Sequence, residues 1–189
     1  MSGLVIAAPL RFEAFMIARG RPRARVRQTG VGPRRARAAV PGLLEDPAEV
    51  LLVLGFGGGL MPDSEVGEVV VADEVVGPDG ARVRCANTSA LSHALESRGL
   101  RVRCGTVTSV ARPAMGKTRV RLREAGAIAV DMESAWLAPA ARGRPFAVVR
   151  VLSDTPRREL TRPLLTVAGV ARASLTLRRV ATALREWVP

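Results

Sequence analysis

Two acidic segments follow apolar runs and hold the side chains best suited to chemistry. Residues 131–134 (Asp-Met-Glu-Ser) come after the run 127–130, and Ser153-Asp154 follows the run 146–152. In open α/β sheets, ligands bind beyond the carboxyl ends of the strands. A carboxyl group buried there could serve as a general acid or base. The structural alternatives are an acid at a helix N-terminus for the first segment and an N-cap for the second.

Two glycine-rich segments also follow apolar runs. They are residues 29–32 (Thr-Gly-Val-Gly) and residues 55–60 (Gly-Phe-Gly-Gly-Gly-Leu). Glycines let backbone N–H groups approach a ligand, and successive N–H groups can bind an anion. A helix that starts after residue 32 would add its N-terminus to such a site. Tightly packed turns are the alternative, and a Walker loop is excluded because no Gly-Lys-Ser/Thr follows.

The elements that must position these segments alternate along the chain between β-rich apolar runs and helical patterns. This alternation is typical of a parallel-strand α/β fold, and the 189 residues are expected to form one domain, 1–189. The expected strands cover residues 4–8, 24–29, 50–54, 66–76, 81–85, 102–110, 127–130 and 146–152. The expected helices cover residues 12–18, 33–44, 88–98, 117–125 and 132–141, with one or two amphipathic helices over 164–187.

The charge of the chain is strongly positive, with a net value of +12. Nearly all basic residues are arginine, aromatic residues make up 3% and tyrosine is absent, so a platform for stacking nucleic-acid bases is not expected. We therefore predict no nucleic-acid partner. The charge could instead attract small anions or an acidic membrane surface.

The few cysteine and histidine residues argue against a metal site or a disulfide framework. Cys85 and Cys104 lack the spacing of a zinc site, and His93 is the only histidine. We predict no metal site and no histidine-based triad. No apolar run approaches the ~20 residues that span a bilayer, and we expect residues 1–8 to be a first strand rather than a signal peptide. A cytoplasmic location is expected.

The order of these segments resembles the nucleoside phosphorylase/nucleosidase superfamily. The resemblance covers residues 4–154 and rests on segments 29–32, 55–60, 66–73 (Val-Gly-Glu-Val-Val-Val-Ala-Asp), 130–134 (Val-Asp-Met-Glu-Ser) and 149–154 (Val-Arg-Val-Leu-Ser-Asp). It implies a single-domain three-layer α/β/α fold with a mixed, mostly parallel central sheet. It also implies an enzyme that cleaves the N-glycosidic bond of a purine nucleoside and assembles as a homodimer or a higher homo-oligomer.

Within the superfamily, two segments look most like the hopanoid-associated phosphorylase. They are residues 114–117 (Ala-Met-Gly-Lys) and 126–134 (Gly-Ala-Ile-Ala-Val-Asp-Met-Glu-Ser). That family is taken to act on adenosylhopane and to release adenine. The implied substrate is an adenine nucleoside with a modified 5′ substituent, and a lipid nucleoside would bring peripheral membrane association. Methylthioadenosine/adenosylhomocysteine nucleosidases and futalosine hydrolases are the hydrolytic alternative, and a non-catalytic nucleoside-binding protein is a second one.

The resemblance also implies roles for individual residues at the sugar and the base. Glu133 would bind the ribose hydroxyls, and Met132 would pack on the sugar. Asp154 would protonate the purine N7, with Ser153 positioning its carboxyl group. No Phe or Tyr lies in residues 106–115, so the contact with the base would come from Val110 or from a neighbouring subunit.

The resemblance allows two nucleophiles, phosphate and water, and implies residues for each. Gly57 and Gly58 would line the site of phosphate or water, and Arg11 would bind phosphate. Glu13 falls where nucleosidases place the carboxylate that holds water. Because Phe56 replaces the hydroxyl residue of the nucleosidases and the glycines offer backbone N–H groups to an anion, phosphorolysis is favoured over hydrolysis. Inorganic phosphate is then the co-substrate, and no other cofactor is expected.

Overall fold

The computed structural model describes residues 3–157, 163–185 and 187. Its strands are β1 (Leu4–Ala8), β2 (Arg25–Gln28), β3 (Val50–Gly59), β4 (Val69–Val76), β5 (Arg82–Arg84), β6 (Val102–Ser109), β7 (Ala127–Asp131) and β8 (Phe146–Asp154). Its helices are α1 (Arg11–Arg19), α2 (Pro33–Leu44), α3 (Thr88–Glu96), α4 (Lys117–Glu124), α5 (Ser134–Leu137), the 3-10 helix η1 (Ala138–Ala141) and α6 (Pro163–Ala183).

The sheet is mixed and mostly parallel, as predicted. Strand β3 lies at its centre and pairs in parallel with β1 and β8, while β1 pairs in parallel with β2. Strand β8 pairs antiparallel with β4, which continues in parallel to β6 and from there to β7. The end of β3 then pairs antiparallel with β7 through Gly58 and Gly59. The sheet therefore curls around until it closes on its own central strand.

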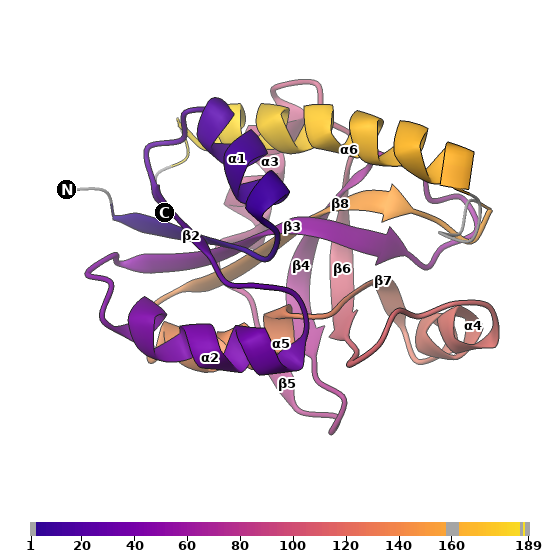
Figure 1. Ribbon diagram of the computed structural model, residues 1–189, viewed down its shortest axis with the longest axis horizontal. Helices are drawn as coiled ribbons and strands as arrows, with labels where there is room; N and C mark the ends of the chain where they lie inside the picture. The colour runs from indigo at the N-terminus through magenta and orange to yellow at the C-terminus, as the bar shows by residue number, and fades with distance from the viewer. Residues whose placement is uncertain (1–2, 158–162, 186, 188–189) are drawn as a thin grey trace.

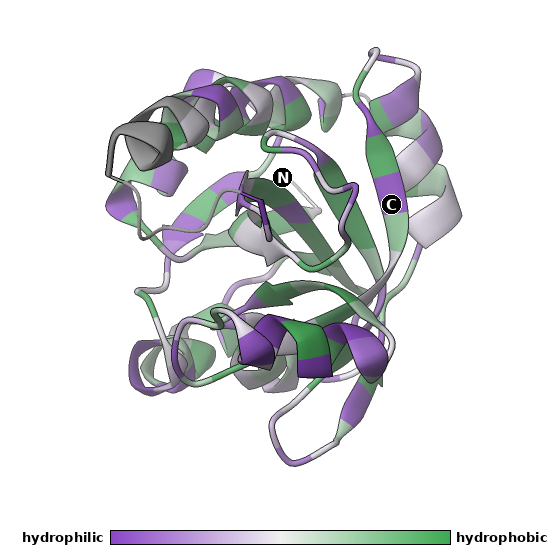
Figure 2. Cartoon of the chain, turned by 90° about the vertical axis from the view of Figure 1, so that its right-hand side faces the viewer, coloured by the Kyte–Doolittle hydropathy of each residue, from purple (hydrophilic) through white to green (hydrophobic). Residues whose placement is uncertain are grey.

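Helices cover the sheet on both faces, which confirms the three-layer architecture (Figure 1). Side chains alternate along β1, so Leu4 and Ile6 pack with α1, α3 and α6, whereas Val5 and Ala7 pack with α2 and α5. Figure 2 shows the strands mostly in hydrophobic colours and the helices striped, as expected for elements with one buried side. No described helix combines the length and the apolar character needed to cross a bilayer.

The expected glycine loop at residues 55–59 is wrong. These residues continue β3 to Gly59, where Phe56 pairs with Val151 and Gly57 with Leu152 of β8. The register shifts between Gly57 and Gly58, so that Gly58 lies opposite Asp154. The glycines are strand residues beside β8, and the prediction of a loop of bare N–H groups fails for this reason.

The expected helix over residues 132–141 is also corrected. It begins only at Ser134, because the Asp131 carboxylate accepts the N–H groups of Glu133 and Ser134 and holds this junction in a turn. Beyond Leu137 the chain tightens into η1, which contains Pro139. Proline has no N–H group and interrupts α-helical bonding. The described part of the C-terminal region forms one helix, α6.

Candidate active site

One cavity brings together nearly all the residues predicted from the sequence. Its volume is about 290 Å³, and the ends of β3, β7 and β8 meet there with the start of α1. Of the predicted residues, its lining contains Glu13, Gly57, Gly58, Val110, Met132, Glu133, Ser153 and Asp154. Arg11 does not line this cavity and lies exposed at the start of α1. The structure therefore does not place the expected phosphate ligand at the site.

Arg150 is a buried cation at the centre of the acidic residues. Arg150 lies on β8, and its side chain is fully buried. Its Nε lies 2.9 Å from Asp131 Oδ2, and its Nη2 lies 2.7 Å from the same oxygen. Nη2 also donates to Ser134 Oγ at 3.0 Å and lies 3.5 Å from Glu133 Oε2. One guanidinium group thus joins the residues on both sides of the β7–α5 junction.

The charges around Arg150 set the protonation of its partners. Burial alone would raise the pKa of Asp131, but the Arg150 charge and the Ser109 hydroxyl hold it below its usual range. Ser109 Oγ donates to Asp131 Oδ1 at 2.6 Å. The pKa of Glu133 is raised, because its burial outweighs the attraction of the more distant Arg150. Burial opposes the charge of Arg150 itself, but Asp131 and Glu133 raise its pKa above the usual value.

The segment 29–32 positions Glu133. The N–H group of Gly32 donates to Glu133 Oε1 at 3.0 Å. Gly32 has a φ of 83°, in a region of backbone conformation that favours glycine. Helix α2 begins directly afterwards at Pro33. The Thr-Gly-Val-Gly segment therefore fixes one carboxylate oxygen of Glu133 and leaves the other toward Arg150.

Glu13 is a second buried carboxyl group of the cavity, on the first turn of α1. Its side chain accepts the N–H group of Leu10 at 2.6 Å and that of Phe56 at 2.6 Å. Burial raises the pKa of Glu13 to about 7, although these two N–H groups and the Arg150 charge oppose the shift. A Cβ atom at Gly55 would lie 2.8 Å from Glu13 Oε1, so glycine at this position lets the carboxyl group reach β3.

Asp154 forms a buried ion pair with Arg119 of α4. Arg119 also donates from Nε to the Ala114 carbonyl at 2.9 Å and from Nη1 to the Gly59 carbonyl at 2.8 Å. Ser153 Oγ lies 3.3 Å from Asp154 Oδ1. A Cβ atom at Gly58 would lie 3.0 Å from Arg119 Nη2, so glycine leaves room for the pair.

The sequence predictions missed both arginines of the site. Arg150 did leave a signal, because it is the single charged residue of the apolar run 146–152 that was expected to be a buried strand. Arg119 left no such signal in the sequence, because it lies among other charged residues in 117–125. Only the fold brings it to Asp154. The predicted acidic residues of the cavity are buried, with Glu133 and Asp154 each 4% exposed. Glu133 lies at the N-cap of α5 and Glu13 in the first turn of α1, but neither is displayed to solvent there.

The fold and the site together define an α/β enzyme with several carboxyl groups in one cavity, where the pKa values of Glu13 and Glu133 are raised and that of Asp131 is lowered. A family model described as the Phosphorylase superfamily matches residues 7–185. The chain belongs to the phosphorylase superfamily, whose enzymes cleave the N-glycosidic bond of nucleosides. No curated protein sequence matches the chain.

Solved structures share the fold along almost the whole chain. The 5′-methylthioadenosine/S-adenosylhomocysteine nucleosidase of Neisseria meningitidis matches with a TM-score of 0.82 and 19% identity over 97% of this chain and 99% of that chain. The futalosine hydrolase of Helicobacter pylori matches with a TM-score of 0.81 and 16% identity over 96% of each chain. The S-adenosylhomocysteine nucleosidase of Streptococcus pyogenes matches with a TM-score of 0.78 and 21% identity over 96% of each.

The first prediction concerns the buried charge of Arg150. Replacing Arg150 by Met leaves the Asp131 and Glu133 carboxylates without their cation, and removing one partner of a buried pair costs about 3–5 kcal/mol. We expect R150M to lose about that much free energy of unfolding in urea at neutral pH. The matched control Arg121→Met, on the exposed side of α4, should change it by less than about 0.5 kcal/mol.

Adding Asp131→Asn to R150M should recover part of this loss, since it removes one of the stranded charges. This double variant keeps the test decisive if R150M alone does not fold. An R150M protein as stable as the wild type would show that Arg150 does not hold the site together.

Proposed function

We propose that this cavity cleaves the N-glycosidic bond of a purine nucleoside with adenine as the leaving base. The observation that carries the proposal is that Glu13, Glu133 and Asp154 line one cavity although they lie far apart in the sequence. Cleavage passes through an oxocarbenium-like state, in which positive charge grows on the sugar. Carboxyl groups at three positions of one lining can stabilise that charge, protonate the base and hold a nucleophile.

Glu133 is the proposed ligand of the ribose hydroxyls. One of its oxygens accepts the Gly32 N–H group, and the other lies at the edge of Arg150, so its orientation is set before substrate arrives. A carboxylate that binds the hydroxyls stabilises the positive sugar more than the neutral ground state. Met132 lines the same cavity and is the proposed packing surface for the sugar.

Asp154 is the proposed acid for the leaving base. A purine anion is a poor leaving group, and a proton delivered to N7 makes its departure easier. In the structure Arg119 and Ser153 both lie within reach of the Asp154 carboxyl group. Arg119 can stay anchored to the carbonyls of Ala114 and Gly59 while Asp154 turns to the base. Val110, which also lines the cavity, is the proposed contact for the base.

Water is the nucleophile that we propose, in place of the phosphate favoured from the sequence. Glu13 lies in the cavity lining, and its pKa of about 7 suits a general base near neutral pH. Its carboxylate would repel phosphate. Gly57 and Gly58 line the cavity, but two other expected features of a phosphate site are missing from it. Arg11 lies outside the lining, and residues 55–59 form a strand in which the N–H group of Phe56 already donates to Glu13.

An apolar group at the ribose 5′ position is the proposed substituent of the nucleoside. The rest of the lining is largely apolar and contains Pro9, Leu10, Val31, Pro113 and Val170. Such a lining favours an apolar substituent over a phosphorylated one. Adenosylhopane, the substrate suggested by residues 114–117 and 126–134, and methylthioadenosine, which is bound in a solved nucleosidase of Helicobacter pylori, both meet this requirement.

The second prediction tests the proposed acid. Asp154→Asn keeps the shape of the side chain but cannot deliver a proton, so turnover should fall by at least ~10²-fold. The measurement is adenine release from methylthioadenosine and from adenosylhopane, with circular dichroism to confirm folding. Asp79→Asn, in an exposed turn, is the control and should keep full activity. Near-wild-type turnover in folded D154N would remove Asp154 from the mechanism.

The third prediction tests the nucleophile. After rigorous removal of phosphate, adenine release should continue undiminished and the second product should be the free sugar. Glu13→Gln should abolish most of this release, whereas Glu124→Gln on the exposed end of α4 should not affect it. Release that stops without phosphate, with a sugar 1-phosphate formed when phosphate is restored, would replace hydrolysis by phosphorolysis.

A further inference from the structure

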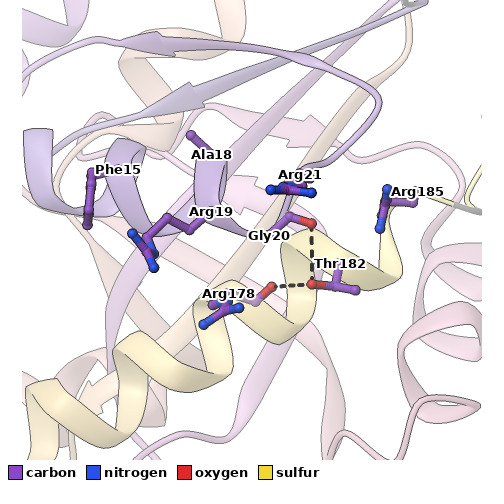
Figure 3. Close-up of a pocket in the computed structure, with 8 residues that line it drawn as sticks. All are labelled: Phe15, Ala18, Arg19, Gly20, Arg21, Arg178, Thr182 and Arg185. Atoms are coloured by element: carbon purple, nitrogen blue, oxygen red, sulfur yellow. Dashed lines mark hydrogen bonds between the residues drawn. The ribbon is translucent and has the colours of Figure 1, made fainter.

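A second cavity lies away from the proposed active site, between the end of α1 and the last turns of α6. Its volume is about 580 Å³, and Figure 3 shows the side chains that surround it. Four arginines line it, Arg19, Arg21, Arg178 and Arg185, and its lining contains no acidic residue. Arg178 lies on α6 and Arg185 lies two residues beyond its end, and both side chains line the cavity. The cavity thus concentrates positive charge at the surface.

These four arginines have no carboxylate partner within the described part of the chain. None of them takes part in an ion pair there, in contrast to Arg25, Arg103 and Arg150. The two helices add little negative charge of their own, since Glu13 is the only acidic residue within α1 and α6. Glu13 is buried and faces the active cavity. The outer side of these helices therefore shows arginine without compensating carboxylates.

Large apolar side chains are exposed on the same two helices. Phe12 is 48% and Phe15 is 55% exposed on α1, and Leu175 is 62% exposed on α6. Phe12 and Phe15 are three residues apart and share one side of α1, and Arg19 lies over the Phe15 ring at 5.5 Å. Helices α1 and α6 run beside each other on one face of the sheet (Figure 1). We call this surface the α1–α6 face.

The α1–α6 face is a firmly packed platform. A Cβ atom at Gly20 would lie 2.6 Å from Ala181 Cβ and 2.7 Å from the Arg178 carbonyl oxygen, so the end of α1 touches the backbone of α6. The Thr182 hydroxyl donates to the Gly20 carbonyl at 3.3 Å. Figure 3 marks this hydrogen bond with a dashed line. The arginines and the phenylalanines are consequently held on one fixed surface.

We propose that the α1–α6 face docks on a membrane surface that contains anionic phospholipid. Guanidinium groups bind phosphate with strong charge-assisted hydrogen bonds, and four arginines line the 580 Å³ cavity, which would receive a lipid phosphate. Phe12, Phe15 and Leu175 then enter the boundary between headgroups and acyl chains. Basic residues combined with exposed aromatic and aliphatic ones are the pattern of surfaces that lie on anionic bilayers.

A second copy of the chain fits this face less well. In a two-fold dimer the same patch lies on both sides of the interface, so the arginines of both copies would gather in one interface and repel one another. No carboxylate on the outer side of α1 or α6 offsets that repulsion in the described structure. An anionic bilayer instead supplies the missing negative charge together with an apolar layer.

The α1–α6 face also adjoins the active cavity. Leu10, at the N-cap of α1, and Val170 of α6 belong to the lining of that cavity. Leu10 is 41% exposed and precedes Phe12 in the chain. Docking through this face would therefore bring the cavity close to the bilayer, while a soluble nucleoside would still bind without it.

The fourth prediction is the vesicle test of this face. The full chain should cosediment with phosphatidylcholine vesicles that contain phosphatidylglycerol and not with pure phosphatidylcholine, and added salt should weaken binding. Arg178→Gln with Arg185→Gln should weaken it about fivefold for each arginine removed. Phe15→Ser should also weaken it. The matched control, Arg34→Gln with Arg121→Gln, removes the same charge from exposed positions of α2 and α4 and should bind like the wild type.

Adenine release from soluble methylthioadenosine should be unchanged in all these variants, because none of the substituted residues lines the active cavity. Equal weakening in the Arg34/Arg121 control would overturn the proposal, because binding would then follow net charge alone. Tighter binding to a single-stranded RNA than to the vesicles would assign the face to nucleic acid. Displacement from vesicles by inorganic phosphate, but not by chloride of equal ionic strength, would assign it to a free anion, and dimerisation lost in F15S would assign it to a second copy.

Discussion

The site depends on one buried positive charge, the guanidinium group of Arg150. It is fully buried, and it lies among the carboxyl groups of Asp131, Glu133 and Glu13. Several carboxylates in a dry interior would otherwise bind protons or oppose folding. Arg150 stabilises the charge of Asp131 more than that of Glu133, because its Nη2 lies 2.7 Å from the Asp131 carboxylate and 3.5 Å from that of Glu133. Asp131 therefore stays ionised as a structural partner, while the carboxyl groups of Glu133 and Glu13 keep raised pKa values.

The glycines of β3 make this arrangement possible through the space they leave. Gly55 gives room to Glu13 and Arg150, and Gly58 gives room to Arg119 and Asp154. The closure of the sheet between β3 and β7 brings the Gly58 end of β3 beside the segment that carries Glu133. A segment that resembles an anion-binding loop is thus a strand that lets four charged side chains approach its backbone.

The sequence predicts the acidic residues of the site well for a physical reason. A carboxyl group at the carboxyl end of a buried apolar strand lies where such sheets bind ligands. Asp154 is the last residue of β8, and Glu133 follows the end of β7 by two residues. The alternation of apolar runs likewise predicts the layers and most element positions. Pairs formed across the fold leave no such local pattern, so the partnership of Arg119 with Asp154 is visible only in the structure. The expected contact of Arg11 failed because Glu13, on the inner side of the same helix turn, enters the cavity while Arg11 lies exposed.

The proton affinity of Glu13 is the central claim of this account, and the pH dependence of kcat/KM tests it most directly. If Glu13 must be ionised to activate water, kcat/KM for methylthioadenosine should rise with pH through an apparent pKa of about 7. Burial raises this value, so activity should already be low at a pH where an ordinary glutamate is still ionised. A rise with an apparent pKa near the usual 4.5, or a profile that is flat through neutral pH, would contradict the account.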